Sequence, residues 1–409
     1  MTIQKYGQWE SYPGDESYSL ALPDYFSLYL AYTYDTTLHP NTRLRITGDF
    51  PYARYMSFNV YATRSGTSLA ALTDYQIRTD SLNVNPFVAG SDELAKNRRY
   101  TVNVEPQTSA TGGEQAASES DITENLLAYN PSDLKVAEFP EALLTVVIRY
   151  YVPAGDYGNV DPPSVEVLSM DTGKPLDPQP KSYPTNMDAN EPIFRYRLHP
   201  IFENINGDTL RFYHSEGKGQ FNNADNLYLI SAVEGVDGEN NAVILRVIPP
   251  TFPRDNKDFD KRDVRYWSIN QGNPNTSTSA GMRDGRFRLA TDGFVYLVMG
   301  GESVRLKAEQ GGYNYLPWKA DRPRAVIIYR NMLTNPQYRG SIQRVPMLPE
   351  APWSNEQLAV YEASRFIGNY APSGKKVTAE EFNTNYGGLP SPGFAPLPRD
   401  EGEREAEGR

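Results

Sequence analysis

Four residues in the second half of the chain have side chains suited to holding a sugar: Tyr266, Trp267, Trp318 and Arg330. Aromatic rings offer flat faces on which the C–H groups of a sugar stack, and a guanidinium group donates hydrogen bonds to hydroxyl oxygens. The same pattern is typical of packing, because aromatic residues that recur along strands usually lie in a core. Packing is the favoured interpretation, and a carbohydrate-binding platform is the alternative.

Three acidic residues in the segment RDNKDFDKRD, residues 254–263, could supply oxygens to a calcium ion: Asp255, Asp258 and Asp260. Calcium takes about six to eight oxygen ligands. The lysine and arginine residues between these acids would repel the ion, so a solvated loop whose charges pair with one another is favoured. Calcium is the one cofactor that the sequence leaves open, and it predicts no other.

No residue of the chain is predicted to be catalytic. The sequence has three histidines and no cysteine. His39 and His199 each precede a proline, which is typical of a turn. Ser215 follows His214, but the sharp G-x-S-x-G turn of a nucleophilic serine is missing around it. Paired carboxylates cannot be ranked among so many acidic residues, so enzymatic activity stays open and a non-enzymatic protein is favoured.

The candidate sugar-binding residues lie in a stretch of alternating apolar and polar residues, Val264 to Leu333, which turn-forming residues divide. This pattern predicts strands with one buried face. The first half contains the same pattern, because RYMSFN at 54–59 is similar to RYWSIN at 265–270. In the same way, LTVVIRYYVP is similar to RAVIIYRNML. We therefore predict an all-β protein of two related β-sandwich or jelly-roll-like halves, with a short helical appendage at the C-terminus.

Changes in composition along the chain predict where these parts begin and end. A segment rich in proline and without periodicity separates the halves, and a second one precedes a charged tail. The expected parts are an N-terminal arm (1–17), a first sandwich half (18–170), a linker (171–192), a second sandwich half (193–350), short helices (351–388) and a disordered tail (389–409).

At RYWSIN, DGFVYLVMG, YLPW and IIYRNML, the chain resembles a group of uncharacterised bacterial proteins known only as domains of unknown function. These proteins share an RYWS-type strand, a DG-initiated strand, an LPW turn and a final basic and aromatic strand. The segments GDFPYARYMSFNVY and NVNPF are similar to the first half of the same group. The resemblance covers most of residues 40–390 and implies a twin β-sandwich without implying an activity. The chain departs from the group at Tyr315, where a tryptophan is usual.

The charge and hydropathy of the chain exclude some partners. Its formal net charge is −11, and it has no cluster of lysine and arginine residues with which to replace phosphate counterions, so nucleic acid is not expected as a partner. No segment approaches the roughly 20 apolar residues of a spanning helix, so membrane insertion is not expected. The N-terminal sequence has no apolar core of a signal peptide, which favours a cytoplasmic protein, with an exported mature form as the alternative.

These observations lead to two hypotheses of function. The first is a non-catalytic structural or self-assembling protein whose contacts are with copies of itself. The second is a carbohydrate-binding or glycan-active protein that uses the Tyr266, Trp267, Trp318 and Arg330 platform. A blank glycan array would count against the second, and a stable monomer would count against the first.

Overall fold

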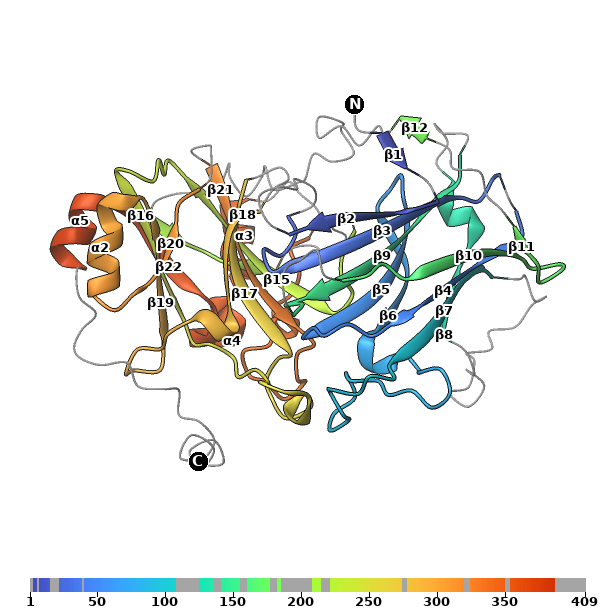
Figure 1. Ribbon diagram of the computed structural model, residues 1–409. Coiled ribbons are helices and arrows are strands. Elements are labelled where there is room, and N and C mark those ends of the chain that lie inside the picture. The colour runs from blue at the N-terminus through green and yellow to red at the C-terminus, as the bar shows by residue number, and fades with distance from the viewer. Residues whose placement is uncertain are drawn as a thin grey trace.

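The computed structural model describes residues 3–5, 7–14, 22–38, 40–107, 125–135, 141–154, 160–176, 182–184, 208–214, 221–273, 278–319, 324–349 and 354–386. Four five-stranded sheets form most of it, which confirms the predicted all-β fold (Figure 1). Every helix in these ranges is too short or too polar to span a bilayer.

The first half contains two sheets. Its inner sheet has the order β2 (Trp9–Pro13), β3 (Ser27–Asp35), β9 (Leu143–Tyr151), β5 (Tyr55–Ala62) and β6 (Thr67–Thr73). Its outer sheet has the order β11 (Pro175–Leu176), β10 (Ser164–Ser169), β4 (Thr42–Asp49), β7 (Arg99–Pro106) and β8 (Asn125–Tyr129). A separate ladder joins β1 (Ile3–Lys5) to β12 (Ser182–Pro184).

The second half repeats this plan. Its inner sheet has the order β14 (Tyr213–His214), β15 (Asn226–Glu234), β21 (Arg324–Met332), β17 (Tyr266–Gly272) and β18 (Thr278–Arg283). Its outer sheet has the order β13 (Thr209–Leu210), β22 (Ser373–Thr378), β16 (Asn241–Val247), β19 (Val295–Gly300) and β20 (Asn314–Pro317).

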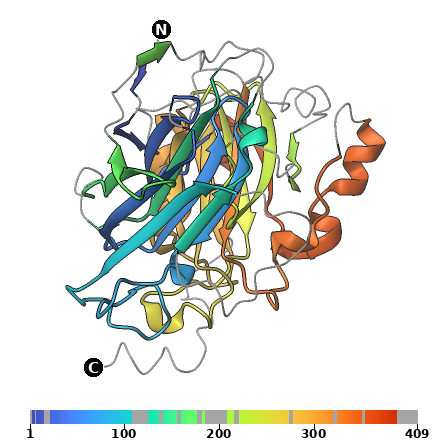
Figure 2. The same ribbon diagram turned by 90° about the vertical axis from the view of Figure 1, so that its right-hand side faces the viewer.

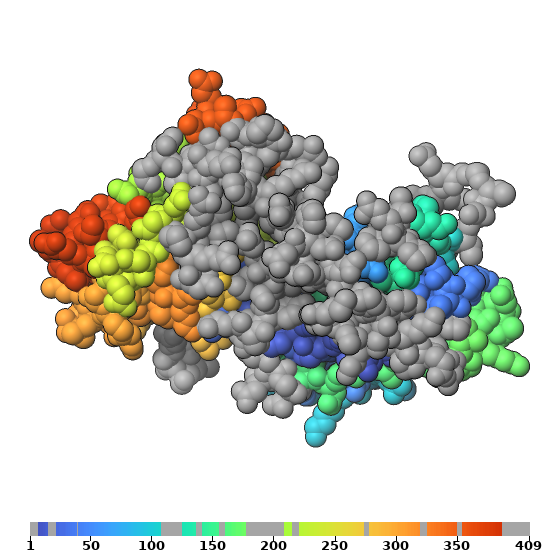
Figure 3. Space-filling view, turned by 90° about the horizontal axis from the view of Figure 1, so that it is seen from above, coloured from blue at the N-terminus to red at the C-terminus, as the bar shows by residue number. Residues whose placement is uncertain are grey.

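Short helices connect or follow these strands. The α-helices are α2 (Glu302–Gln310), α3 (Asn355–Tyr361), α4 (Ser364–Ile367) and α5 (Ala379–Asn385). The 3-10 helices are η1 (Asp74–Gln76), η2 (Pro131–Leu134), η5 (Asn256–Asp258), η6 (Asp284–Arg286), η7 (Ile342–Arg344) and η8 (Gly368–Tyr370). Helix α5 lies at one end of the molecule and the strands β10 and β11 lie at the other (Figure 3).

The register of the strand pairs confirms that the two halves are related. In the first inner sheet Ser57 lies opposite Arg149, and in the second Ser268 lies opposite Arg330. In each outer sheet the last pair of strands is parallel, β7 with β8 and β19 with β20, whereas the other pairs are antiparallel. Two sheets that share both strand order and this mixed pattern are two copies of one architecture.

The inner sheets face each other and the outer sheets lie outside them, so the molecule has four β-layers (Figure 1). Outer strand β4 alternates between buried and half-buried residues, as expected for one covered face. Inner strands β5, β9 and β17 are buried along both faces, because one face meets the outer sheet and the other meets the opposite half. In β5, for example, Phe58 packs into the sandwich core, while Tyr55 belongs to a separate cluster in which the Tyr151 ring contacts both Tyr55 and Tyr266 of the second half.

Two predicted boundaries differ from the structure. Residues 9–13 of the expected arm form β2, the edge strand of an inner sheet, because Trp9 packs its ring on Tyr32. Residues 351–388 contain β22, which pairs with β16 inside the second sandwich, in addition to helices. The sequence of β22, SGKKVT, is polar and has no apolar alternation, so the periodicity of the sequence did not predict this strand. Helix α3 begins with a capping box of Ser354 with Gln357, whereas most of the predicted linker and the whole of the predicted tail lie outside the described residues.

Candidate functional site

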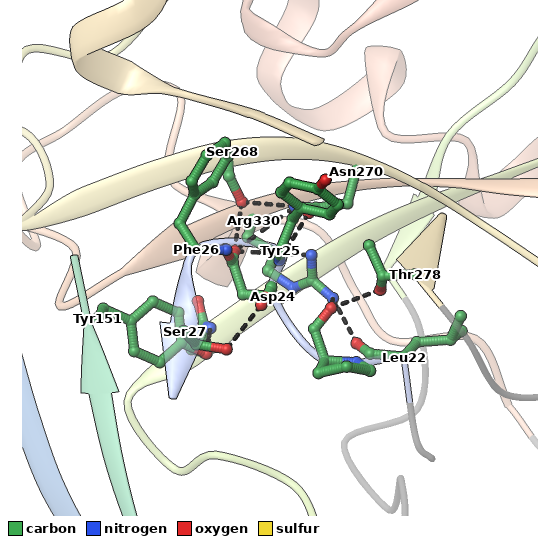
Figure 4. Close-up of polar contacts among 12 residues, drawn as sticks. Leu22, Asp24, Tyr25, Phe26, Ser27, Tyr151, Ser268, Asn270, Thr278 and Arg330 are labelled. Atoms are coloured by element: carbon green, nitrogen blue, oxygen red, sulfur yellow. Dashed lines mark hydrogen bonds and ion pairs between the residues drawn. The ribbon is translucent and has the colours of Figure 1, made fainter. Parts of the chain in front are cut away.

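The densest polar contacts that Figure 4 displays gather around Asp24, which belongs to the first half but is buried against the inner sheet of the second. Its carboxylate accepts hydrogen bonds from the Tyr266 hydroxyl at 2.7 Å and from the Ser268 hydroxyl at 2.6 Å. The Arg330 guanidinium lies 3.6 Å from the same carboxylate. A buried carboxylate with these partners is compensated for the water that it loses.

The chain positions Asp24 by a tight turn ahead of β3. The Asp24 carboxylate accepts from the backbone N–H of Phe26 at 2.9 Å, which is the local bond of an Asx turn. Leu22 has a left-handed backbone with φ of 49°. This conformation is uncommon outside glycine, and here Arg330 donates to the Leu22 carbonyl at 2.6 Å. The turn is therefore held from the second half, as well as by its own bonds.

The structure separates the four residues of the predicted sugar platform. Tyr266 and Arg330 meet at Asp24, with 0% and 2% of their surfaces exposed. Trp267 points to the other face of β17, where its ring stacks on Phe287 at 4.5 Å with an angle of 4° between the planes. Trp318 is half-buried against the second sandwich core. These four residues thus form no exposed platform, and packing accounts for both tryptophans.

Two ion pairs join the halves reciprocally. Arg54 of the first half lies 2.6 Å from Asp284 of the second, and Arg265 of the second half lies 3.3 Å from Asp74 of the first. Burial raises the pKa of the Asp74 carboxyl to about 6, against the lowering effect of Arg265. Burial also raises the pKa of Asp284, which Arg54 opposes. We call these two ion pairs the cross pairs.

A third group of contacts surrounds Asp225 at the start of β15. The Tyr55 hydroxyl donates to the Asp225 carboxylate at 2.6 Å, and the Thr73 hydroxyl donates to it at 2.7 Å. Burial and then the nearby Asp225 charge raise the pKa of Tyr55 well above its usual value, so its hydroxyl stays protonated. Sequence reasoning missed Asp24, Asp74, Asp225 and Asp284. In the folded chain these acids lie near the two copies of the RY pair, and a single sequence does not reveal that proximity.

The calcium candidates are not brought together. The Asp255 side chain caps η5, and the Asp258 carboxylate lies 2.7 Å from Arg262, while Asp260 is exposed. Among the residues that the structure describes, no three acidic or histidine side chains are grouped so as to hold a metal ion. The segment is the self-paired loop that the interleaved charges favour.

The histidines give little support to catalysis. His214 is buried, and its Nδ1 lies 2.7 Å from the Val345 carbonyl. Burial lowers the pKa of His214, so the ring is neutral at pH 7. His39 and His199 lie outside the described residues. The buried acids of the cross pairs and of Asp24 are each held by an arginine from the other half, an arrangement suited to joining the halves.

No family model matches the chain, and no curated protein matches it. Among solved structures, it is similar to that of an uncharacterised protein from Burkholderia cenocepacia, with a TM-score of 0.49 and 12% sequence identity. That similarity covers 88% of this chain and 79% of the other.

Proposed function

We propose that this protein is a non-catalytic structural protein that assembles with copies of itself. The observation that carries the proposal is that buried ion pairs join the two halves. Asp24, Asp74 and Asp284 are each buried and paired with an arginine of the opposite half. Acids and arginines held in this way fix one arrangement of two sandwiches and leave those groups no access to a substrate.

The surface supports homotypic contacts in one region, the loop of residues 80–98 between η1 and β7. Within this loop Leu82 is 92% exposed and Leu94 is 75% exposed. Leu82 also has a left-handed backbone with φ of 65°. Two large apolar side chains exposed on one loop offer surface for a protein–protein contact, and a strained residue that presents one of them is consistent with such a role.

Hydrogen bonds from the second half hold the same loop in place. The Asn256 side chain, in the second half, donates to the carbonyls of Pro86 and Ser91, each at 2.9 Å. The Asn256 backbone N–H also donates to the Glu93 carboxylate. The loop and the segment around η5 lie side by side at the lower edge of the molecule in both ribbon views (Figures 1 and 2). A fixed loop that carries exposed leucines is a suitable surface for self-association, because little conformational freedom is lost on binding.

Light scattering during size-exclusion chromatography tests the proposal. The wild-type protein is expected to elute as an assembly larger than the 46.0 kDa chain. The double variant Leu82→Asp with Leu94→Asp is expected to shift towards the monomer, because the charges oppose burial of the loop. Leu306→Asp is the matched control, since Leu306 is 65% exposed but lies on α2 in the second half. A monomeric wild-type protein would overturn the self-assembly.

A further inference from the structure

Each inner sheet presents the same four polar residues to the opposite half. In each copy, a tyrosine, a serine and an asparagine alternate along one strand, and an arginine lies opposite the serine on the neighbouring strand. The first quartet is Tyr55, Ser57, Asn59 and Arg149, and the second quartet is Tyr266, Ser268, Asn270 and Arg330. In both copies the asparagine side chain donates to the serine hydroxyl, at 2.9 Å and 2.8 Å respectively.

The segments that cover the two quartets are also equivalent. Leu22 covers the second quartet and Phe221 covers the first, and both have left-handed backbones, with φ of 49° and 55°. Arg330 donates to the Leu22 carbonyl and Arg149 donates to the Phe221 carbonyl, in each case at 2.6 Å. The residue that follows two positions later is Asp24 in one segment and Asn223 in the other.

Local hydrogen bonds confirm that Asp24 and Asn223 are counterparts. The Asp24 side chain accepts from the N–H of the residue two positions later at 2.9 Å, and the Asn223 side chain does the same at 3.1 Å. The tyrosine hydroxyl of each quartet lies within hydrogen-bond distance of the equivalent oxygen, Tyr266 at 2.7 Å from Asp24 and Tyr55 at 3.1 Å from Asn223, and Tyr55 shares its proton with Asp225. A carboxylate in one half therefore corresponds to a neutral amide in the other.

This exchange leaves the two arginines in different surroundings. Arg330 has the Asp24 carboxylate at 3.6 Å, whereas Arg149, only 4% exposed, has no carboxylate partner among the described residues. The acid nearest in sequence to Asn223 is Asp225, but its carboxylate already accepts hydrogen bonds from Tyr55 and Thr73. The rings of Tyr29 and Tyr61, 5.6 Å and 5.4 Å from the Arg149 guanidinium, provide weaker compensation.

Polar atoms around Arg149 are left without partners. Among the buried atoms with no hydrogen bond are Nη1 of Arg149, Nδ2 of Asn223 and Oδ1 of Asn59. The first two are donors, and the second takes the place of the carboxylate oxygen that Arg330 faces in the other half. The Asn59 amide can rotate by half a turn, so that its oxygen accepts from Ser57 and its nitrogen becomes a further donor. Donors with one buried positive charge between them are what a small anion requires.

We propose that the first quartet, with Asn223, binds a small monovalent anion of the size of chloride or formate. The anion lies between Arg149 and Asn223 and supplies the negative charge that Asp24 supplies to Arg330. The counterion of Arg330 in the second half is thus a residue of the chain, whereas the counterion of Arg149 in the first half comes from solution. The inference is independent of self-assembly, because it rests on residues inside one chain.

Thermal unfolding with sodium chloride, titrated at constant ionic strength against sodium sulfate, tests the site. Wild-type protein is expected to gain about 2–5 °C in Tm as the site fills. Asn223→Asp is expected to lose that gain, since it places a carboxylate where Asp24 lies in the other half. General effects of the salt on the surface act equally on both proteins, so only the difference between them reports the site. Equal responses of the two proteins would overturn the proposal.

Two further measurements keep the test sound if Asn223→Asp folds poorly. Asp24→Asn makes the second quartet resemble the first, and it is expected to lower Tm and to add a second chloride-dependent gain. Chloride-ion NMR line broadening on the wild-type protein needs no variant, and formate is expected to reverse it by competition. Absence of broadening, or broadening that formate leaves unchanged while acetate reverses it, would contradict an anion site of this size.

Discussion

Arg54 and Asp284 lie 2.6 Å apart across the boundary between the halves, and their counterparts Asp74 and Arg265 form the reciprocal pair at 3.3 Å. An interface in which residue i of one part meets residue j of the other, and j meets i, is the mark of an isologous dimer. Here both parts belong to one chain. The molecule is therefore built as a fused dimer of two β-sandwiches, and its charged centre is an interface.

Removing one partner of a cross pair is expected to destabilise the protein strongly. Arg54→Met leaves the Asp284 carboxylate, which is fully buried, without its nearest cation. A buried ion pair broken in this way typically loses about 3 kcal/mol of unfolding free energy. Urea denaturation measures the loss. Arg305→Met, which removes an exposed pair with Glu302, is the control and should leave the midpoint unchanged. A small effect of Arg54→Met would mean that Arg283, 3.4 Å from the same carboxylate, compensates its charge.

The pH dependence of stability follows from Asp74. Its pKa rises from 3.8 in the unfolded chain to about 6 in the folded protein, so the folded state binds the proton more tightly. The stability that this provides is full below about pH 4 and is lost as pH rises through 6, a change of about 3 kcal/mol. Asp74→Asn removes this dependence.

The control for this measurement has the opposite sign. The hydrogen bond from Arg262 lowers the pKa of Asp258, so its contribution is present at neutral pH and is lost as pH falls. Denaturation of wild type, Asp74→Asn and Asp258→Asn at pH 4, 5, 6 and 7 separates the two effects. If the difference between wild type and Asp74→Asn is constant over this range, the folded pKa of Asp74 is not raised.

Alanine substitutions of the two tryptophans of the predicted platform should lower the unfolding free energy by different amounts. Trp267 is 1% exposed and stacks on Phe287, so Trp267→Ala is expected to cost about 3–5 kcal/mol of unfolding free energy. Trp318 is half-buried, so Trp318→Ala should cost less. Chemical denaturation compares them. Near-native stability of Trp267→Ala would contradict its place in the core.

The local part of the fold could be predicted from the sequence. The strands around Phe58 and Ile269 alternate, and the repeated RY-x-S-x-N pattern identifies the duplication. The strand β22 could not be predicted, because its two lysines and one glycine give no apolar period. The helix α2 is weakly amphipathic and buries only Val304 and Ala308 fully, which explains why it was missed.

The contacts at the centre could not be predicted for a different reason. Asp24 and Tyr266 are 242 residues apart, and Arg54 and Asp284 are 230 apart. Which acid meets which arginine depends on how two complete sandwiches pack, and no period within a strand carries that information. Tyr266 and Arg330, two of the four predicted platform residues, meet at this carboxylate because β17 and β21 are neighbouring strands of one sheet.

The equivalent tyrosines of the two quartets provide a last comparison within one molecule. Tyr266→Phe removes a donor from the Asp24 carboxylate, which is 1% exposed, and leaves it with the Ser268 hydroxyl, the Phe26 backbone N–H and Arg330. Losing a bond to a buried charged group costs about 1–3 kcal/mol. Tyr55→Phe removes a donor from Asp225, which is half-buried and keeps the Thr73 hydroxyl, 2.8 Å and 2.7 Å from its two carboxylate oxygens.

Tyr266→Phe is therefore expected to be the more destabilising of the two, and urea denaturation of both variants measures the difference. Both substitutions remove one hydroxyl from a fully buried ring, so their effects on packing are matched. If Tyr55→Phe costs as much as Tyr266→Phe, then Asp225 and Asn223 together depend on the Tyr55 hydroxyl as strongly as Asp24 depends on Tyr266, and the halves are balanced at this position. A larger effect of Tyr266→Phe would show that the duplicated quartets have diverged, with the second specialised to hold a carboxylate of its own chain.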